Sequence, residues 1–139
     1  MSTKTYHGSC HCGAVRYEAD LDLEAGTYRC NCSSCMKNRS WFAPAPPEAV
    51  RIVSGAEMLR DYRWIPPGRD AANLTFRFCR TCGARTVGDG GHGFDGKPFR
   101  FVSIATLDDA DADVLAASLR YFDGKHDRYD QIPEDIRLL

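Results

Sequence analysis

Hydrophobic and polar residues alternate along several short segments of the chain, a pattern typical of half-buried β-strands. In N-L-T-F-R-F-C (73–79), a leucine and two phenylalanines occupy every second position, and F-R-F-V-S-I (99–104) behaves similarly. Weaker alternation predicts further strands at 14–18, 27–30, 51–53, 59–64, 85–87 and 119–122.

Turn-forming residues separate these segments. A-P-A-P-P (43–47), I-P-P-G (65–68) and G-D-G-G-H-G-F-D-G-K-P (88–98) predict loops, because prolines this clustered are poorly suited to the interior of central strands. D-D-A-D-A-D-V-L-A-A-S-L (108–119) predicts the one helix, with acidic residues in its first turn. Many short strands and hardly a helix indicate a β-rich fold (all-β or mainly β), and 139 residues predict a single domain over 1–139.

Composition narrows the class of protein. Apolar residues at 43% and charged residues at 27% are ordinary for a globular domain. The net charge is −1 and the arginines are scattered along the chain, so we expect no nucleic-acid partner. We find no signal-peptide pattern and no apolar run approaching the ~20 residues of a membrane span, so we expect a cytoplasmic protein without membrane contact.

The most informative residues are the seven cysteines. An odd number cannot pair fully in disulfides, and a reducing compartment keeps thiols free, so metal ligation or thiol chemistry is the favoured interpretation. Two groups, C-H-C-G (10–13) and C-R-T-C-G (79–83), each place a glycine directly after the second cysteine. Gly13 and Gly83 would allow the backbone to turn with positive φ and to point its N–H groups at the thiolates.

We predict a closed four-thiolate zinc site from these two groups, Cys10 with Cys12 and Cys79 with Cys82. Because 66 residues separate Cys12 from Cys79, the metal would close a long loop and stabilise the fold. Unligated thiols in the core and a disulfide are the alternatives.

The third group, in R-C-N-C-S-S-C-M-K (29–37), has three cysteines: Cys30, Cys32 and Cys35. Three thiolates without a fourth cysteine predict an open zinc site, in which water or substrate takes the fourth position. A closed site would recruit a histidine, and the chain has four: His7, His11, His92 and His126. A redox sensor, in which oxidation of the thiolates ejects zinc, is a further alternative.

Other residues near these motifs carry weaker predictions. Lys37 or Arg39 would help to neutralise the negative charge of the three-cysteine group. His92 and His126 have suitable pKa values for proton transfer, although each is more typical of a loop histidine. Aromatic residues would wall a pocket or fill the core: Trp41, Phe42 and Trp64. G-D-G-G-H-G (88–93) fits a dinucleotide-binding pattern, but a strand follows where a helix is required, so we interpret it as a loop over the site.

Four segments together resemble one known family: G-S-C-H-C-G-A-V-R-Y-E (8–18), C-N-C-S-S-C-M-K (30–37), F-R-F-C-R-T-C-G (76–83) and A-T-L-D (105–108). In this order they resemble the glutathione-dependent formaldehyde-activating enzymes, also called the CENP-V/GFA domain family. The segment Y-F-D-G-K-H-D-R-Y (121–129) is similar to one branch of it. The resemblance covers essentially the whole chain; Asn31 departs from it, because many members have His there.

The resemblance implies an Mss4-like fold of small antiparallel sheets around a structural zinc held by Cys10, Cys12, Cys79 and Cys82. It implies a catalytic zinc at Cys30, Cys32 and Cys35, so two zinc ions per chain, and an extended loop in place of the helix at 108–119. The implied activity is that of a carbon–sulfur lyase, in which glutathione or a similar small thiol adds to formaldehyde. The alternative is a zinc-binding interaction module without catalysis, because CENP-V is a chromatin-associated protein.

Overall fold

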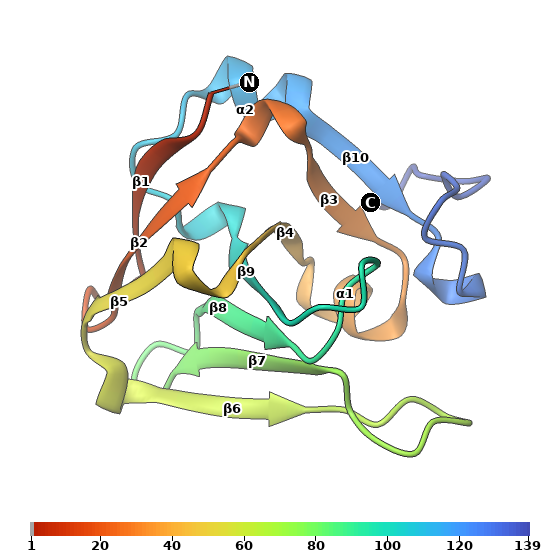
Figure 1. Ribbon diagram of the computed structural model, residues 1–139, viewed down its shortest axis with the longest axis horizontal. Coiled ribbons are helices and arrows are strands. Elements are labelled where there is room, and N and C mark those ends of the chain that lie inside the picture. The colour runs from red at the N-terminus through yellow and green to blue at the C-terminus, as the bar shows by residue number, and fades with distance from the viewer. Residues whose placement is uncertain (1) are drawn as a thin grey trace.

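The computed structural model describes residues 2–139, which form ten β-strands and two short α-helices (Figure 1). The strands are β1 (Lys4–Ser9), β2 (Arg16–Leu21), β3 (Thr27–Cys30), β4 (Trp41–Ala45), β5 (Val50–Ser54), β6 (Leu59–Arg63), β7 (Leu74–Cys79), β8 (Arg85–Gly90), β9 (Phe99–Ser103) and β10 (Leu119–Phe122). The helices are α1 (Ser33–Asn38) and α2 (Ala112–Ser118). The predicted β-rich fold is confirmed.

The strands form two sheets. Three of them make an antiparallel sheet in the order β1-β2-β5, and the other seven make a sheet in the order β10-β3-β4-β9-β8-β7-β6. Every pair in the larger sheet is antiparallel except β10 with β3, which are parallel. Figure 1 shows that β3 and β10 cross the direction of β6–β8 steeply, so the larger sheet is strongly twisted.

The core lies between the two sheets. From β2, Tyr17, Ala19 and Leu21 point inward at every second position, and Ala43 and Ala45 of β4 meet them. Burial at every second position is what a strand with one buried face requires. All five residues are at most 8% exposed, so their burial holds the sheets together.

The opposite face of the larger sheet carries a row of aromatic rings, to which five strands contribute. Phe122 stacks on Tyr28 with ring centroids 4.4 Å apart, and Phe42 lies 6.1 Å from Phe101, which lies 5.5 Å from Phe76. Successive side chains of a strand alternate between faces, so the last residue of β3, Cys30, shares this face with Tyr28.

The structure confirms the eight predicted strands with small shifts of their ends, and two of them, 27–30 and 119–122, agree residue for residue. We did not predict β1, α1 or β4, and assigning 43–47 to a loop was wrong. Pro44 lies within β4, a central strand, although proline has no N–H to donate to a ladder. Pairing of β4 with β3 ends at Phe42, so at Pro44 the strand is paired only with β9. The proline therefore occupies a position that is locally an edge.

The helix at 108–119 shows which of two conflicting expectations was right. The acidic residues followed by alanines predict a helix, whereas the resemblance implies an extended loop. The structure has α2 over Ala112–Ser118, and the Asp111 side chain caps it by accepting bonds from the N–H groups of Asp113 and Val114. The local pattern was right and the implied loop wrong.

The loop between β8 and β9 begins later than predicted. The segment expected as a loop at 88–98 starts in β8, which continues to Gly90, and the connection to β9 follows. No helix begins after G-D-G-G-H-G, which confirms that this is not a dinucleotide-binding motif.

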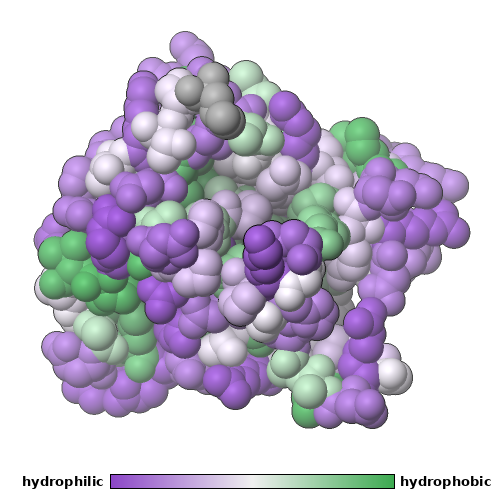
Figure 2. Space-filling model, in the orientation of Figure 1, coloured by the Kyte–Doolittle hydropathy of each residue, from purple (hydrophilic) through white to green (hydrophobic). Residues whose placement is uncertain are grey.

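None of the helices within residues 2–139 has the length and the apolar composition needed to cross a lipid bilayer. On the face drawn in Figure 2 the surface is mostly hydrophilic, with apolar patches over β5 and over the C-terminal segment. The exposed apolar residues there include Val53 of β5 and, after β10, Ile132, Ile136 and Leu138.

A polar cluster joins the three strands of the smaller sheet and predicts how stability depends on pH. The carboxylate of Asp20 in β2 accepts bonds from Arg51 of β5 at 2.9 Å and from Thr5 of β1 at 2.7 Å. These bonds, the one from Arg51 first, lower the pKa of Asp20 from 3.8 to about 2. The unfolded chain therefore binds a proton at Asp20 more tightly than the folded chain does. The ionised Asp20 stabilises the fold above about pH 4, and this stabilisation is lost as the pH falls toward about 2.

We therefore expect the free energy of unfolding of the wild type to fall more steeply than that of Asp20→Asn between about pH 4 and about pH 2. Urea denaturation at a series of pH values measures both slopes. Parallel slopes would contradict the ion pair's contribution.

Candidate metal centres

The seven cysteines lie in two separate clusters. Within each cluster all sulfur atoms are within 4.8 Å of one another. The first cluster contains Cys10, Cys12, Cys79 and Cys82, and the second contains Cys30, Cys32 and Cys35. All seven thiols are free, which excludes a disulfide in this structure.

The four-cysteine cluster has the dimensions of a zinc site. The Cys12 sulfur lies 3.7 Å from that of Cys10 and 3.7 Å from that of Cys79. Two sulfurs on one tetrahedral zinc, each ~2.3 Å from the metal, are separated by about 3.8 Å. The four sulfurs therefore fit a zinc ion, with Cys10 and Cys79 buried and Cys12 exposed.

Both turns of the four-cysteine cluster have the predicted backbone. Gly13 has φ of 80° and Gly83 has φ of 77°, in the left-handed region, and their N–H groups donate to the carbonyls of Cys10 and Cys79 at 3.1 and 2.8 Å. A residue with a Cβ would be strained at both positions. The role predicted for the two glycines is confirmed.

Backbone N–H groups also point at the sulfurs. The N–H of Val15 donates to the Cys10 sulfur at 3.3 Å, and that of Thr81 donates to the Cys79 sulfur at 3.4 Å. Similar bonds, from Ala84 first, lower the pKa of Cys82 to about 6. Hydrogen bonds of this kind stabilise thiolates, the form that binds metal.

The three-cysteine cluster forms where β3 ends and α1 begins. Cys30 is the last residue of β3, Cys32 is the N-cap of α1 and Cys35 lies in the first turn of the helix. The N–H of Cys35 donates to the Cys32 sulfur at 3.4 Å, so this thiol takes the role that a serine or aspartate plays at most helix starts. Within residues 2–139 no histidine or carboxylate joins the three sulfurs.

The charge of the three-cysteine cluster explains why it fits a cation. Bonds from the thiols of Cys30 and Cys35 lower the pKa of Cys32. The bond to Cys32, together with burial, raises the pKa of Cys30, and bonds to Cys30 and Cys32, together with burial, raise that of Cys35. One thiolate is thus stabilised at the expense of the other two. A cation among the sulfurs removes this conflict, and three sulfur donors suit zinc.

A segment from the far end of the sequence covers this cluster. Asn31 lies between two of the cysteines, and its side-chain NH₂ donates to Asp123 at 2.7 Å while its oxygen accepts from the N–H of Lys125 at 2.8 Å. The side chain of Asp123 is nearly buried and also bonds to His126 Nδ1 at 2.9 Å. The bond from Asn31, followed by that from His126, lowers the pKa of Asp123. The residue that departs from the family pattern therefore anchors residues 123–126 to the cluster.

Gly124 makes the closest approach to the cluster. A Cβ built on it would lie 2.4 Å from the Cys30 sulfur and 3.3 Å from the Cys32 Cβ. Any side chain here would displace the sulfur, because real Cβ atoms do not approach a neighbour so closely. The sequence pattern did not identify this glycine, since its contact is made over ninety residues along the chain.

The Asn31 contact predicts an effect on local opening. In Asn31→Ala we expect the amide of Lys125 to exchange with solvent about tenfold faster or more, because the segment 123–126 loses two side-chain bonds. Hydrogen exchange measured by NMR checks this. Asn38→Ala is the matched control, since Asn38 donates only to Ser34 within α1. Equal exchange of Lys125 in both variants would show that Asn31 does not anchor the segment.

Neither predicted cation bonds to the three sulfurs in the part of the chain that the structure describes. Lys37 is exposed, and Arg39 donates to the Leu138 carbonyl in the C-terminal segment. Arg85 of β8 instead lies 4.4 Å above the Phe76 ring, with its Nη1 buried and without a hydrogen-bond partner in residues 2–139. Burial lowers the pKa of Arg85, and a thiolate at Cys35 would oppose this. The alternation pattern only identified a strand here.

The remaining candidates lie at a distance from the sulfurs or on other surfaces. His7 is exposed and bonds to Asp109 at 2.8 Å, and the backbone of His92 bonds to Asn73. Trp41 donates to Thr27 on the α2 side of the sheet, so of the three predicted aromatic residues only Phe42 lies in the aromatic row. Trp64 is 45% exposed.

The 91–98 connection, interpreted as a loop over the site, reaches the covering segment through one residue. The Phe94 ring lies 6.0 Å from those of Phe122 and Tyr129. Tyr129 in turn lies beside Gly124, the residue next to Cys30: its Cε1 would be 3.3 Å from a Cβ atom built on Gly124. The loop thus contacts the segment that covers the three-cysteine cluster.

Comparison with known proteins agrees with this arrangement. A Rhodobacter sphaeroides protein of known crystal structure superimposes with a TM-score of 0.65 at 31% sequence identity, over 83% of this chain and 98% of that one. The family model described as glutathione-dependent formaldehyde-activating enzyme matches residues 5–123, which include all seven cysteines. The chain therefore belongs to the glutathione-dependent formaldehyde-activating enzyme family.

Proposed function

We propose that this protein is a zinc-dependent carbon–sulfur lyase that forms or cleaves the adduct of a small thiol with an aldehyde such as formaldehyde. The proposal rests on one observation, a cluster of three cysteine sulfurs that no fourth ligand from residues 2–139 completes, in a chain of this family. Cys10, Cys12, Cys79 and Cys82 would hold a structural zinc, and Cys30, Cys32 and Cys35 a second one.

A zinc ion held by Cys30, Cys32 and Cys35 would act as a Lewis acid and would lower the pKa of a substrate thiol well below its free value of ~8.5. In the forward direction the thiol sulfur donates an electron pair to the aldehyde carbon and a C–S bond forms. The carbonyl π pair moves to oxygen, which takes up the proton that the thiol released. In the reverse reaction the hydroxyl oxygen loses its proton and the carbonyl π bond re-forms, while the C–S bond breaks and its electron pair returns to sulfur, which takes up the proton.

The residues around the cluster can assist this chemistry. Three thiolates and Zn²⁺ sum to −1, and a substrate thiolate makes the total −2. Arg85 would supply a positive charge that interacts with a Cys35 thiolate. Its guanidinium lies over Phe76, and its buried Nη1 has no hydrogen-bond partner in residues 2–139. A positive charge in a water-poor setting is more effective than one in solvent.

Tyr129 would donate a hydrogen bond to the aldehyde oxygen. Its Cε1 lies 3.3 Å from a Cβ atom built on Gly124, and burial raises its pKa to about 12, so its hydroxyl is protonated at neutral pH and would stabilise the oxygen without releasing its proton. The backbone of Gly124 covers the Cys30 sulfur and excludes water from that side.

The experiment that tests the proposal measures the exchange between free and thiol-bound formaldehyde by two-dimensional NMR with ¹³C-formaldehyde and glutathione. The zinc-loaded protein is expected to accelerate exchange above the rate without protein, and the Cys32→Ser variant is expected to show only the uncatalysed rate. An uncatalysed rate with the fully loaded wild type, for glutathione and for other small thiols, would refute the lyase assignment.

A further inference from the structure

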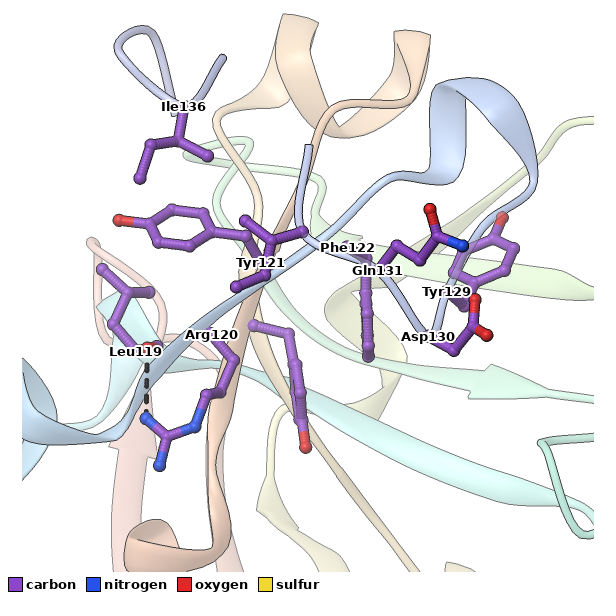
Figure 3. A pocket seen from close by; sticks show the side chains of 10 residues that line it. Leu119, Arg120, Tyr121, Phe122, Tyr129, Asp130, Gln131 and Ile136 are labelled. Atoms are coloured by element: carbon purple, nitrogen blue, oxygen red, sulfur yellow. Dashed lines mark hydrogen bonds between the residues drawn. The ribbon is translucent and has the colours of Figure 1, made fainter. Parts of the chain in front are cut away.

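A pocket of about 430 Å³ lies between the edge strand β10 and the C-terminal segment (Figure 3). Its walls are the side chains of β10, Tyr28 of the neighbouring strand β3, and residues 129–136, which fold back over the edge. Ligand pockets in proteins typically have volumes of ~300–1,000 Å³. The family model ends at residue 123, so the outer wall of the pocket lies beyond the part of the chain that the model matches.

The pocket adjoins the three-cysteine cluster through two shared residues. Phe122 lies opposite Cys30 in the parallel pairing of β10 with β3, and its ring centroid is 5.8 Å from that of Tyr129. A Cβ atom built on Gly124 would lie 3.3 Å from Tyr129 Cε1 and 2.4 Å from the Cys30 sulfur. Gly124 fills the space between Tyr129 and Cys30, but Phe122 shares one face of the sheet with Cys30, its partner in the pairing, so a molecule with its sulfur at the cluster reaches the pocket along the Phe122 ring.

The lining is chiefly apolar. Figure 3 shows Tyr121 and Ile136 at one end of the pocket and Phe122 and Tyr129 at the other. Its charged residues are Asp130 and Arg120, and the Arg120 guanidinium already donates to the carbonyls of Ala117 and Leu119. Glutathione carries two carboxylates and one ammonium group at neutral pH, and a wall of aromatic and aliphatic side chains offers these groups few partners.

We propose that this pocket binds an apolar substituent of the substrate, so that the preferred thiol carries an aliphatic or aromatic group in place of the charged tripeptide of glutathione. This inference rests on the proposed function, since it places the substrate sulfur at Cys30, Cys32 and Cys35. Burial of the apolar group against Tyr28, Tyr121 and Ile136 supplies the selectivity, because each buried methylene favours binding. The C–S bond that forms or breaks is the same one as for glutathione.

The test compares benzyl mercaptan with glutathione in the formaldehyde-exchange measurement. We expect a KM about tenfold lower for benzyl mercaptan. Ile136→Glu places a carboxylate in the wall and is expected to remove this advantage while changing the glutathione reaction less than about twofold. Leu138→Glu is the matched control, because Leu138 lies in the same segment but does not line the pocket, and it is expected to behave as wild type.

Equal KM values for the two thiols, or an unchanged benzyl mercaptan reaction in Ile136→Glu, would overturn the inference and leave the lyase function standing. Absence of catalysis with both thiols would instead remove the proposed function. In that case the methyl resonances of Ile132 and Ile136 decide: shifts on titration with benzyl mercaptan, and not with glutathione, support an apolar ligand site, and unchanged resonances overturn it.

Discussion

Replacing Cys79 by alanine is expected to prevent folding, giving little soluble protein and no cooperative thermal transition. Cys79 is fully buried, and its sulfur lies 3.7 Å from that of Cys12, so the variant loses a metal ligand at the point that joins β7 to the end of β1. Structural zinc sites contribute about 10–16 kcal/mol in small zinc domains, whereas whole domains are stable by only about 5–15 kcal/mol. Weakening this site therefore removes most of the stability. Soluble yield, circular dichroism and zinc per chain measure the effect.

The control for this prediction is Cys79→Val. Valine fills the buried position with an apolar side chain of similar size but has no sulfur, so it separates metal binding from packing. We expect it to fail as the alanine variant does. A soluble Cys79→Val protein with the zinc content of the wild type would mean that Cys79 is a packing residue and not a metal ligand.

Replacing Cys32 is expected to leave the fold intact and to abolish catalysis. Cys32→Ser keeps an acceptor at the N-cap of α1, where the sulfur now accepts from the N–H of Cys35, so the helix start is preserved. Serine is a far poorer zinc ligand than a thiolate, and zinc should fall from two per chain to one. We expect the thermal midpoint to change by a few degrees at most and the exchange activity to fall at least about a thousandfold.

Cys32→Ala separates the cap from the metal. It should lose the same zinc and the same activity, and in addition about 1 kcal/mol of stability for the missing cap. Elemental analysis and denaturant unfolding of both variants, purified under reducing conditions without chelator, measure the two effects. If the wild type itself held one zinc, the three-cysteine cluster would have no tight metal and the redox-sensor or interaction-module hypotheses would take precedence.

The grouping of the cysteines could be predicted from the sequence because metal-ligand motifs are local. C-x-C-G and C-x-x-C-G each describe a turn of four or five residues, and the backbone of Gly13 and Gly83 follows from the need for positive φ after two ligands. Strand positions such as 74–79 followed from alternation, which needs only one buried face. Zinc itself, and the division into structural and catalytic sites, stay predictions.

Predictions from local sequence patterns failed where the structure depends on a neighbouring strand. Proline is unfavourable in central strands because it lacks an N–H group. The pairing of β4 with β3 ends at Phe42, however, so Pro44 is unpaired on that side. Similarly, nothing in M-K-N-R marks Arg39 as a partner of the C-terminal segment, and nothing in G-A-R-T indicates that the Arg85 guanidinium lies over the Phe76 ring.

The sequence by itself determined which residues can bind metal, how they are grouped, and the β-rich class of the fold, because thiolate chemistry and side-chain alternation depend on neighbours a few positions away. Only the tertiary structure decided what surrounds the three sulfurs. The parallel pairing of β10 with β3 brings Asp123, Gly124 and Tyr129 to Cys30 from the other end of the chain. Such contacts depend on long-range strand pairing, which no local pattern encodes, and they shape the pocket in which we place the substrate.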